Sequence, residues 1–302
     1  MIRRYGRPMT LTDDVRAGAA EIAAHATQVR IDVDALAAIE PAPAPALDPE
    51  RHYLEGPPED VASYLLTLDA VNFGSGWFPT LRKRHDGGRP VSGYFTVAWA
   101  LADHFRAHGA WTNAQLRTMR ADAVARVLGQ PRDHELMALY AQALRSLGCF
   151  LGGRSALDLV HEAGGSAVAL AEMLASGMAM FHDAGFFKRA QIVPSDLALA
   201  GVAEFSDLDR LTIFADNLVP HVLRCDGVLI YDERLAARID AGRPLRMGAQ
   251  EREIRGCAVH ACRLIAERLG MDERTLDQRL WNRGQAPAYK ARPRHRCHTV
   301  YY

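Results

Sequence analysis

Apolar residues recur every three or four positions along most of this chain, whereas alternation with a period of two is scarce. The first spacing places side chains on one face of an α-helix, and the second is typical of a half-buried strand. We therefore predict an all-α, mainly helical protein with a few short strands. No unit of about 20 to 50 residues repeats along the chain, which argues against a solenoid.

Capping residues, prolines and glycines set the expected element boundaries. Pro57 and Pro58 precede a helix that reaches residue 71, where the glycines and proline of NFGSGWFP stop it. Further helices are expected at 12–27, 92–107, 112–128, 133–148, 155–163, 166–175, 189–200, 219–225, 232–241, 249–269 and 272–282. Short strands are expected at 228–231 and 298–302.

Residues 1–50 are expected to form an N-terminal helical segment and a proline-rich connector, both packed on the body of the protein. Thr12 can cap the first amides of a helix, and two acidic residues follow it where the helix dipole favours negative charge. Prolines occupy four of nine positions in 41–49, which favours a stiff, extended connector. Residues 51–302 are expected to form one helical domain.

Charge and motif content narrow the class of function. The 36 basic and 36 acidic residues cancel, which argues against a protein that mainly grips nucleic-acid backbone. Five cysteines without a CxxC pair, and histidines without an HExxH pattern, predict neither a disulfide framework nor a metal site. Nucleotide-cofactor motifs are also missing, and Gly74-Ser75-Gly76 is only a turn signal, so we expect no cofactor.

No apolar run approaches the roughly 20 residues that span a bilayer, and no secretory signal is visible. A cytoplasmic protein is the default expectation, with no membrane partner and no nucleic-acid partner. We expect a monomer.

Two adjacent cations, Lys188 and Arg189, lie beside aromatic residues at the expected start of a helix. The positive end of the helix dipole would repel them unless an anion such as a phosphate binds there. The alternative is a pair of solvated surface charges.

Asp216 stands at a break between two apolar runs, just before Val219 and Pro220. A carboxylate in this position can act in catalysis, or it can merely cap the amides of the next helix. Phe214, two residues earlier, would be a core residue or one wall of a ligand slot.

Asp277 and Trp281 are four residues apart and share a helix face, where a carboxylate beside an indole suits a cationic or donor-rich ligand. An exposed aspartate beside a core tryptophan is the alternative. His52 follows the proline-rich connector and is either a surface residue or a functional one.

Six blocks of the chain together resemble the queuosine salvage protein family, the queuosine 5′-phosphate N-glycosylase/hydrolases. In order they are VASYLLTLDAVNFGSGWFP, FFKRAQIVPSDL, LTIFADNLVPHVLRCDGVLIY, EREIRGCAVHA, LDQRLW and RHRCHTVYY, and they fall within residues 50–302. The resemblance implies a helical catalytic domain similar to helical DNA glycosylases. It also implies hydrolysis of the N-glycosidic bond in queuosine 5′-monophosphate, with release of queuine.

Carried onto this chain, the resemblance makes Asp216 the catalytic carboxylate and makes His52 and Asp277 substrate contacts. Queuine bears a cationic arm, for which Asp277 is the expected partner, with Trp281 and Trp77 as stacking surfaces. Charge alone suggests Lys188 and Arg189 for the 5′-phosphate. The competing hypotheses are a nucleic-acid-binding module like a helix-hairpin-helix or a DNA glycosylase, and a helical scaffold without a site.

Overall fold

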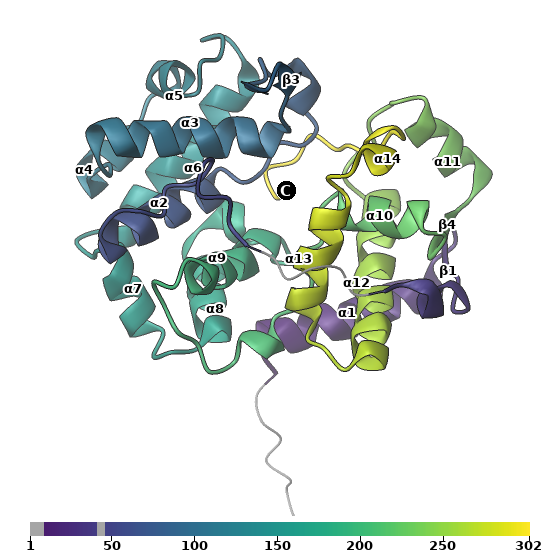
Figure 1. Cartoon of the computed structure of the whole chain (residues 1–302). Helices are drawn as coiled ribbons and strands as arrows, with labels where there is room; N and C mark the ends of the chain where they lie inside the picture. The colour runs from purple at the N-terminus through teal and green to yellow at the C-terminus, as the bar shows by residue number, and fades with distance from the viewer. Residues whose placement is uncertain (1–8, 41–45) are drawn as a thin grey trace, which may run out of the picture.

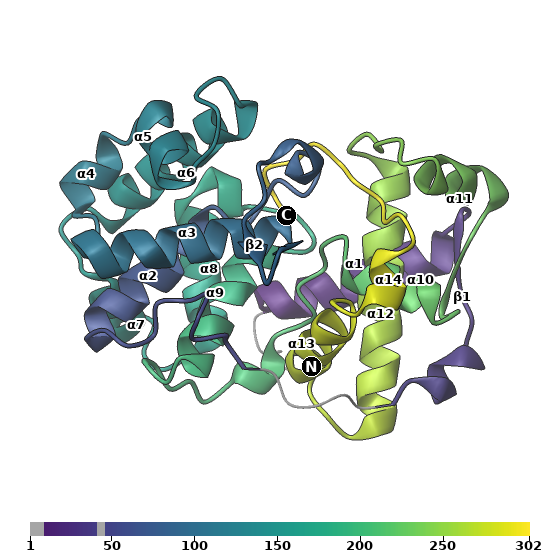
Figure 2. The same cartoon turned by 45° about the horizontal axis from the view of Figure 1, so that its top comes forward.

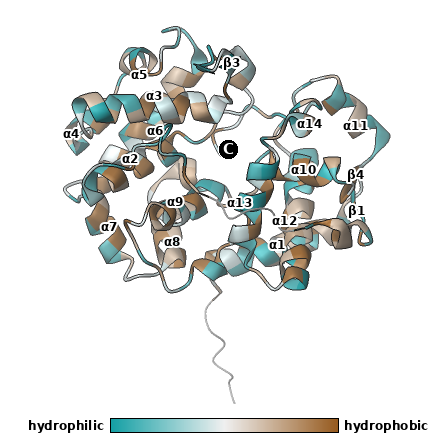
Figure 3. Ribbon diagram, in the orientation of Figure 1, coloured by the Kyte–Doolittle hydropathy of each residue, from teal (hydrophilic) through white to brown (hydrophobic). Residues whose placement is uncertain are grey.

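The structure is a computed structural model that describes residues 9–40 and 46–302. These residues form fourteen α-helices and four short strands, so the prediction of a mainly helical fold is confirmed (Figure 1). Residues 41–45, the first half of the expected proline-rich connector, lie outside the described residues. Hydrophilic and hydrophobic colours alternate around most helices in Figure 3, as expected for elements that bury one face.

One group of helices, drawn in blue and teal in Figure 1, contains the chain from α2 to α9. Its members are α2 (Pro58–Ala70), α3 (Gly93–His108), α4 (Asn113–Arg117), α5 (Ala121–Val127), α6 (Glu135–Leu151), α7 (Ala156–Glu162), α8 (Ala167–Gly177) and α9 (Lys188–Leu199). A hairpin of β2 (His85–Asp86) and β3 (Arg89–Pro90) precedes α3. Helix α2 packs against α3, α6, α7 and α9 and is therefore central to this group.

The second group joins the two ends of the chain. It contains α1 (Leu11–His25), α10 (Val219–Cys225), α11 (Glu233–Asp240), α12 (Ala249–Leu269), α13 (Glu273–Arg283) and α14 (Pro287–Lys290). Strand β1 (Val29–Ile31) pairs antiparallel with β4 (Leu229–Tyr231). Helix α1 packs along α12, where Gly256 leaves room for Ile22: a Cβ at Gly256 would lie 2.6 Å from that side chain.

Most predicted boundaries agree with the structure within a few residues because capping side chains mark them. Thr10, rather than Thr12, caps α1 and forms a capping box with Asp13. The single helix predicted at 112–128 is wrong, because the chain breaks between α4 and α5. There the Thr118 hydroxyl donates to the carbonyl oxygens of Ala114 and Gln115 and competes with helical bonding.

The strand predicted at 228–231 is confirmed, but residues 298–302 form no strand. Their backbone carbonyls accept isolated hydrogen bonds instead. The Gly74 amide donates to the Tyr302 carbonyl, and the Arg189 guanidinium donates to the Val300 carbonyl. The C-terminal segment, residues 291–302, thus leaves α14 and crosses to the first helix group (Figure 2). In residues 9–40 and 46–302, none of the helices combines the length and apolar character needed to cross a bilayer.

Candidate active site

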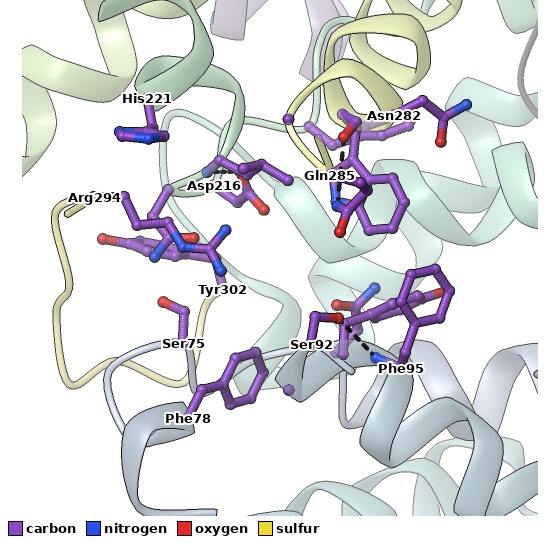
Figure 4. A pocket seen from close by; sticks show the side chains of 18 of the residues that line it. Ser75, Phe78, Ser92, Phe95, Asp216, His221, Asn282, Gln285, Arg294 and Tyr302 are labelled. Carbon is purple, nitrogen blue, oxygen red and sulfur yellow. Dashed lines mark hydrogen bonds between the residues drawn. The ribbon is translucent and has the colours of Figure 1, made fainter. Parts of the chain in front are cut away.

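A cavity of about 840 Å³ lies where the two helix groups face each other. Its walls come from the loop after α2, the starts of α3 and α9, the segment before α10, helices α13 and α14, and the C-terminal segment (Figure 4). A volume in this range accommodates a ligand of nucleotide size. Six of the seven predicted site residues line this cavity, and Arg189 does not.

Asp216 reaches the cavity from the extended segment that leads into α10. Its Oδ1 accepts hydrogen bonds from the amides of Leu218 (2.6 Å) and Val219 (3.3 Å), so it caps this turn. Within the described part of the chain its second oxygen has no hydrogen-bond partner, and Figure 4 shows the carboxylate at the cavity. The two interpretations of Asp216 are therefore compatible, because one oxygen caps while the residue faces a ligand-sized space.

Asp277 is buried in the same wall, on α13. Its Oδ1 accepts a hydrogen bond from the Phe214 amide at 2.9 Å, which fixes the segment that carries Asp216. Burial, and then the negative charge of Asp216, raises the pKa of Asp277 to about 8. The alternative of an exposed aspartate is wrong, since only 4% of this residue is exposed.

Lys188 and Arg189 are both buried, so the alternative of solvated surface charges is wrong. The Lys188 ammonium lines the cavity and donates to the backbone carbonyl (3.0 Å) and side-chain carbonyl (3.1 Å) of Asn72. Burial lowers the pKa of Lys188, and the charge of Asp216 opposes this shift. Phe187, at φ 49°, has a left-handed backbone at the start of α9, a strained conformation that sets the direction of Lys188.

Arg189 turns away from the cavity. Its guanidinium lies near the rings of Phe73 and Phe181 and donates to the carbonyl oxygens of Ala70 (2.6 Å), Val300 (2.7 Å) and Met180. These bonds tie α2 and the C-terminal segment to α9. The expected role of Arg189 in phosphate binding therefore does not fit the structure, because both terminal nitrogens donate to protein carbonyls and the side chain does not line the cavity.

His52 is buried and lines the cavity, so it is not a surface residue. Its Nδ1 lies 2.9 Å from the Asp48 carbonyl and its Nε2 lies 2.9 Å from the Tyr94 hydroxyl. A carbonyl can only accept, so Nδ1 carries the proton and Nε2 accepts from Tyr94. Burial lowers the pKa of His52, which keeps this neutral form at pH 7.

Aromatic rings cover the same side of the cavity. Trp281 makes edge-to-face contacts with Tyr94 and Phe95, with ring centroids 5.6 Å and 5.7 Å apart. Phe214 also lines the cavity. Trp77 does not: it stacks on His298 and its indole donates to Glu135, so the expected stacking role of Trp77 does not fit the structure.

Comparison with known proteins agrees with this geometry. The family profile described as queuosine salvage protein matches residues 51–302. The chain belongs to the queuosine salvage protein family. The resemblance predicted from the six sequence blocks is thereby confirmed.

Two relatives illustrate how much of the chain is shared with this family. A protein of Sphaerobacter thermophilus, named queuosine 5′-phosphate N-glycosylase/hydrolase, is 34% identical over 92% of this chain and 94% of its own length. A protein of the same name from Bos taurus is 28% identical over 82% of this chain and 83% of its own length. The family match itself covers the chain from α2 to the C-terminal segment, which carries most of the residues that line the cavity.

Several cavity residues of this queuosine salvage family member were missed in the sequence. Asp196, on α9, has its pKa raised to about 7 by burial, which Lys188 opposes. Ser75 and Arg294 come from segments more than 200 positions apart, and no local pattern relates them. The one available signal was that both lie inside blocks of the family resemblance.

Proposed function

We propose that this chain hydrolyses the N-glycosidic bond of queuosine 5′-monophosphate and releases queuine, with Asp216 as the carboxylate that faces C1′ of the ribose. The observation that carries the proposal is the Asp216 side chain at the cavity, with one oxygen held by two backbone amides. The names of the Sphaerobacter thermophilus and Bos taurus relatives support the reaction.

Cleavage of a ribosyl C–N bond develops positive charge on the sugar. A carboxylate that is already oriented stabilises this charge, or attacks C1′, without the cost of reorganising in the transition state. The two capping amides fix the Asp216 side chain before the substrate arrives. Lys188 lies close enough for the negative charge of Asp216 to raise the pKa of its ammonium, against the effect of burial.

The base would lie between the aromatic residues and Asp277. Queuine is a 7-deazaguanine, so it lacks the ring nitrogen through which a purine leaving group is commonly protonated. Stabilisation at the sugar by Asp216 therefore has to supply more of the rate enhancement. Asp277 would bind the cationic arm of the base, with Trp281 and Phe214 beside the ring system and His52 holding Tyr94 in place.

The test is incubation of the purified protein with queuosine 5′-monophosphate, followed by chromatography for free queuine. Asp216→Asn should lower turnover by at least about 100-fold, as expected for loss of a well-placed charge stabiliser. Its fold should be intact because the asparagine carbonyl can still accept the two capping bonds. Asp209→Asn is the matched control, since Asp209 is exposed and lies outside the cavity.

Unchanged turnover in Asp216→Asn would remove this residue from the mechanism. Absence of queuine from the wild-type reaction, together with tight binding of duplex nucleic acid, would instead favour the nucleic-acid-binding hypothesis.

A further inference from the structure

Arg255, on α12, is a buried arginine that does not line the cavity, and only 1% of it is exposed. A buried guanidinium is costly unless acceptors use its N–H groups and opposite charges compensate it. The partners of Arg255 therefore show what this side chain holds in place.

Two buried carboxylates compensate the charge of Arg255. Its Nη1 donates to Oδ1 of Asp183 at 3.2 Å and to Oε1 of Glu251 at 3.1 Å, and its Nη2 donates to the second oxygen of Asp183. Asp183 precedes α9 in the first helix group, whereas Glu251 lies one turn before Arg255 on α12. Burial lowers the pKa of Arg255, but the charges of Asp183 and Glu251 outweigh burial and raise this pKa above its ordinary value. The guanidinium therefore stays charged and joins the two helix groups.

The Nε of Arg255 reaches the segment that carries Asp216, where it donates to the Ala215 carbonyl oxygen at 2.8 Å. That oxygen belongs to the planar peptide unit between Ala215 and Asp216, so the bond fixes the backbone from which the Asp216 side chain extends. Residues 211–215 belong to neither a helix nor a strand. This bond and the hydrogen bond to Asp277 therefore hold a segment that has no regular structure of its own.

The same guanidinium also contacts the turn on the other side of the cavity. The Asp183 carbonyl oxygen accepts hydrogen bonds of 2.9 Å and 2.8 Å from two amides of the turn that leads into α9, whose first residue is Lys188. The ring centroid of Phe186, in this turn, lies 4.0 Å from the centre of the Arg255 guanidinium. Arg255 thus touches both the turn before Lys188 and the peptide before Asp216.

We propose that Arg255 is a positioning residue for catalysis, which sets the place of the Asp216 carboxylate relative to Lys188. The inference rests on the proposed function and adds a residue that lies outside the cavity. A displacement of a catalytic group by about 1 Å can lower a rate by about 100-fold, because the reacting atoms lose their alignment. Arg255 acts on both sides of this spacing, since its one planar guanidinium bonds to both segments at once.

Arg255→Lys tests this role because lysine keeps the charge but has a single nitrogen, which cannot bond to the Asp183 carboxylate and the Ala215 carbonyl from two positions. It should lower kcat for queuosine 5′-monophosphate by about 10- to 100-fold and change KM by less than about 3-fold, because the cavity lining is kept while the carboxylate is misplaced. Arg224→Lys is the matched control. Arg224 is also buried outside the cavity and makes two hydrogen bonds to Asp240, at 3.0 Å and 2.8 Å. The kcat of this control should stay within about 3-fold of wild type.

Hydrogen exchange gives a second readout, which does not depend on turnover. Asp216 caps the amides of Leu218 and Val219, so their exchange reports whether its carboxylate is held in place. In full-length Arg255→Lys these amides should exchange at least about 10-fold faster than in wild type, whereas Arg224→Lys should leave them unchanged. Mass spectrometry of the peptides that contain them measures the difference.

Asp183→Asn covers the case in which Arg255→Lys does not fold. Asparagine offers one acceptor oxygen in place of two, so the guanidinium should keep part of its fixation and kcat should fall by about 3- to 10-fold at unchanged KM. Circular dichroism checks that each variant is folded.

A wild-type kcat in folded Arg255→Lys or Asp183→Asn, an equal loss in Arg224→Lys, or a loss that appears only in KM would overturn the assignment. Failure of the proposed function looks different: wild-type protein would release no queuine, while exchange of the capped amides would still depend on Arg255.

Discussion

The two ends of the cavity carry opposite charge and are built in different ways. At one end, which we call the cationic end, the cavity is lined by Ser75 of the loop after α2 and by Arg294 and Arg296 of the C-terminal segment. None of these three side chains has a hydrogen-bond partner among the described residues. At the other end, which we call the base end, Asp277 and Trp281 lie on a regular helix, and the Phe214 amide fixes the Asp277 carboxyl. A ligand with an anion at one extremity and a cation at the other can bind such a cavity in only one orientation.

A basic side chain indicates a ligand only when the protein does not already satisfy it. Arg189 and Arg294 have the same side chain, yet Arg189 is bonded to three carbonyl oxygens from α2, the turn before α9 and the C-terminal segment. The sequence shows which side chains are charged but not which groups they bond to, and for this reason it favoured Arg189 for the phosphate.

The largest expected effect tests this distinction through stability. Arg189→Met should lower the free energy of unfolding by more than about 3 kcal/mol, because three buried or part-buried carbonyls lose their donor at once. Arg294→Gln should change it by less than about 1 kcal/mol, since no protein bond is lost. Urea unfolding followed by circular dichroism measures both. Equal stability of Arg189→Met and wild type would mean that its guanidinium is free for a ligand.

The next expected effect is a loss of activity that appears only with a substrate that carries the cationic arm. At about pH 8.5, above the pKa of Asp277, Asp277→Asn should lower kcat/KM for queuosine 5′-monophosphate by about 30-fold, because the cationic arm loses a charged partner. The asparagine carbonyl can still accept the Phe214 amide, so the segment with Asp216 should keep its place. Guanosine 5′-monophosphate, which has the phosphate but no arm, serves as the control ligand. Equal weakening of both ligands would contradict a role for Asp277 in recognising the arm.

Much of the fold was predictable because it depends on local signals. Helical periodicity, capping residues and helix-stopping glycines set the limits of α2, α10 and α12 to within about two residues of the structure. The errors arise where contacts between residues distant in the sequence determine the structure. Helices α4 and α5 are separate elements that both pack against α6, where Gly148 lets the α4 backbone approach closely. Residues 298–302 pair with no strand, because the Gly74 amide and the Arg189 guanidinium of the other helix group donate to the Tyr302 and Val300 carbonyls.

The candidate site was predictable in part for the same reason. Asp277 and Trp281 lie four residues apart on one helix, so their spacing already indicated a shared face, whereas only the family resemblance linked Asp216 to them. Ser75 and Arg294 meet only because the C-terminal segment crosses to the first helix group. Hydrogen bonds from Arg189 and from the Gly74 amide hold the C-terminal segment in this position. Nothing in the sequence indicates that these two groups bond to it.

The smallest expected effect compares the two ends by pH. Asp277 has a pKa of about 8. Lys83 also has a pKa of about 8, because burial and the charges of Arg294 and Arg296 at the cationic end lower it. The two groups act in opposite directions. As pH rises towards 8, Asp277 loses its proton and gains the charge that binds the arm, so affinity for queuosine should rise by up to about 10-fold per unit. Above pH 8, Lys83 loses its charge, so affinity for guanosine 5′-monophosphate should fall by a few-fold.

Each ligand reports on one end, because queuosine lacks the phosphate and guanosine 5′-monophosphate lacks the arm. Calorimetric titrations from about pH 6.5 to about pH 9 should therefore give opposite slopes, with phosphate already largely dianionic throughout. Asp277→Asn should flatten only the queuosine profile, and Lys83→Met should flatten only the guanosine 5′-monophosphate profile. If one substitution flattened both profiles, the two ends would be coupled through Asp216 and could not be treated as separate binding regions.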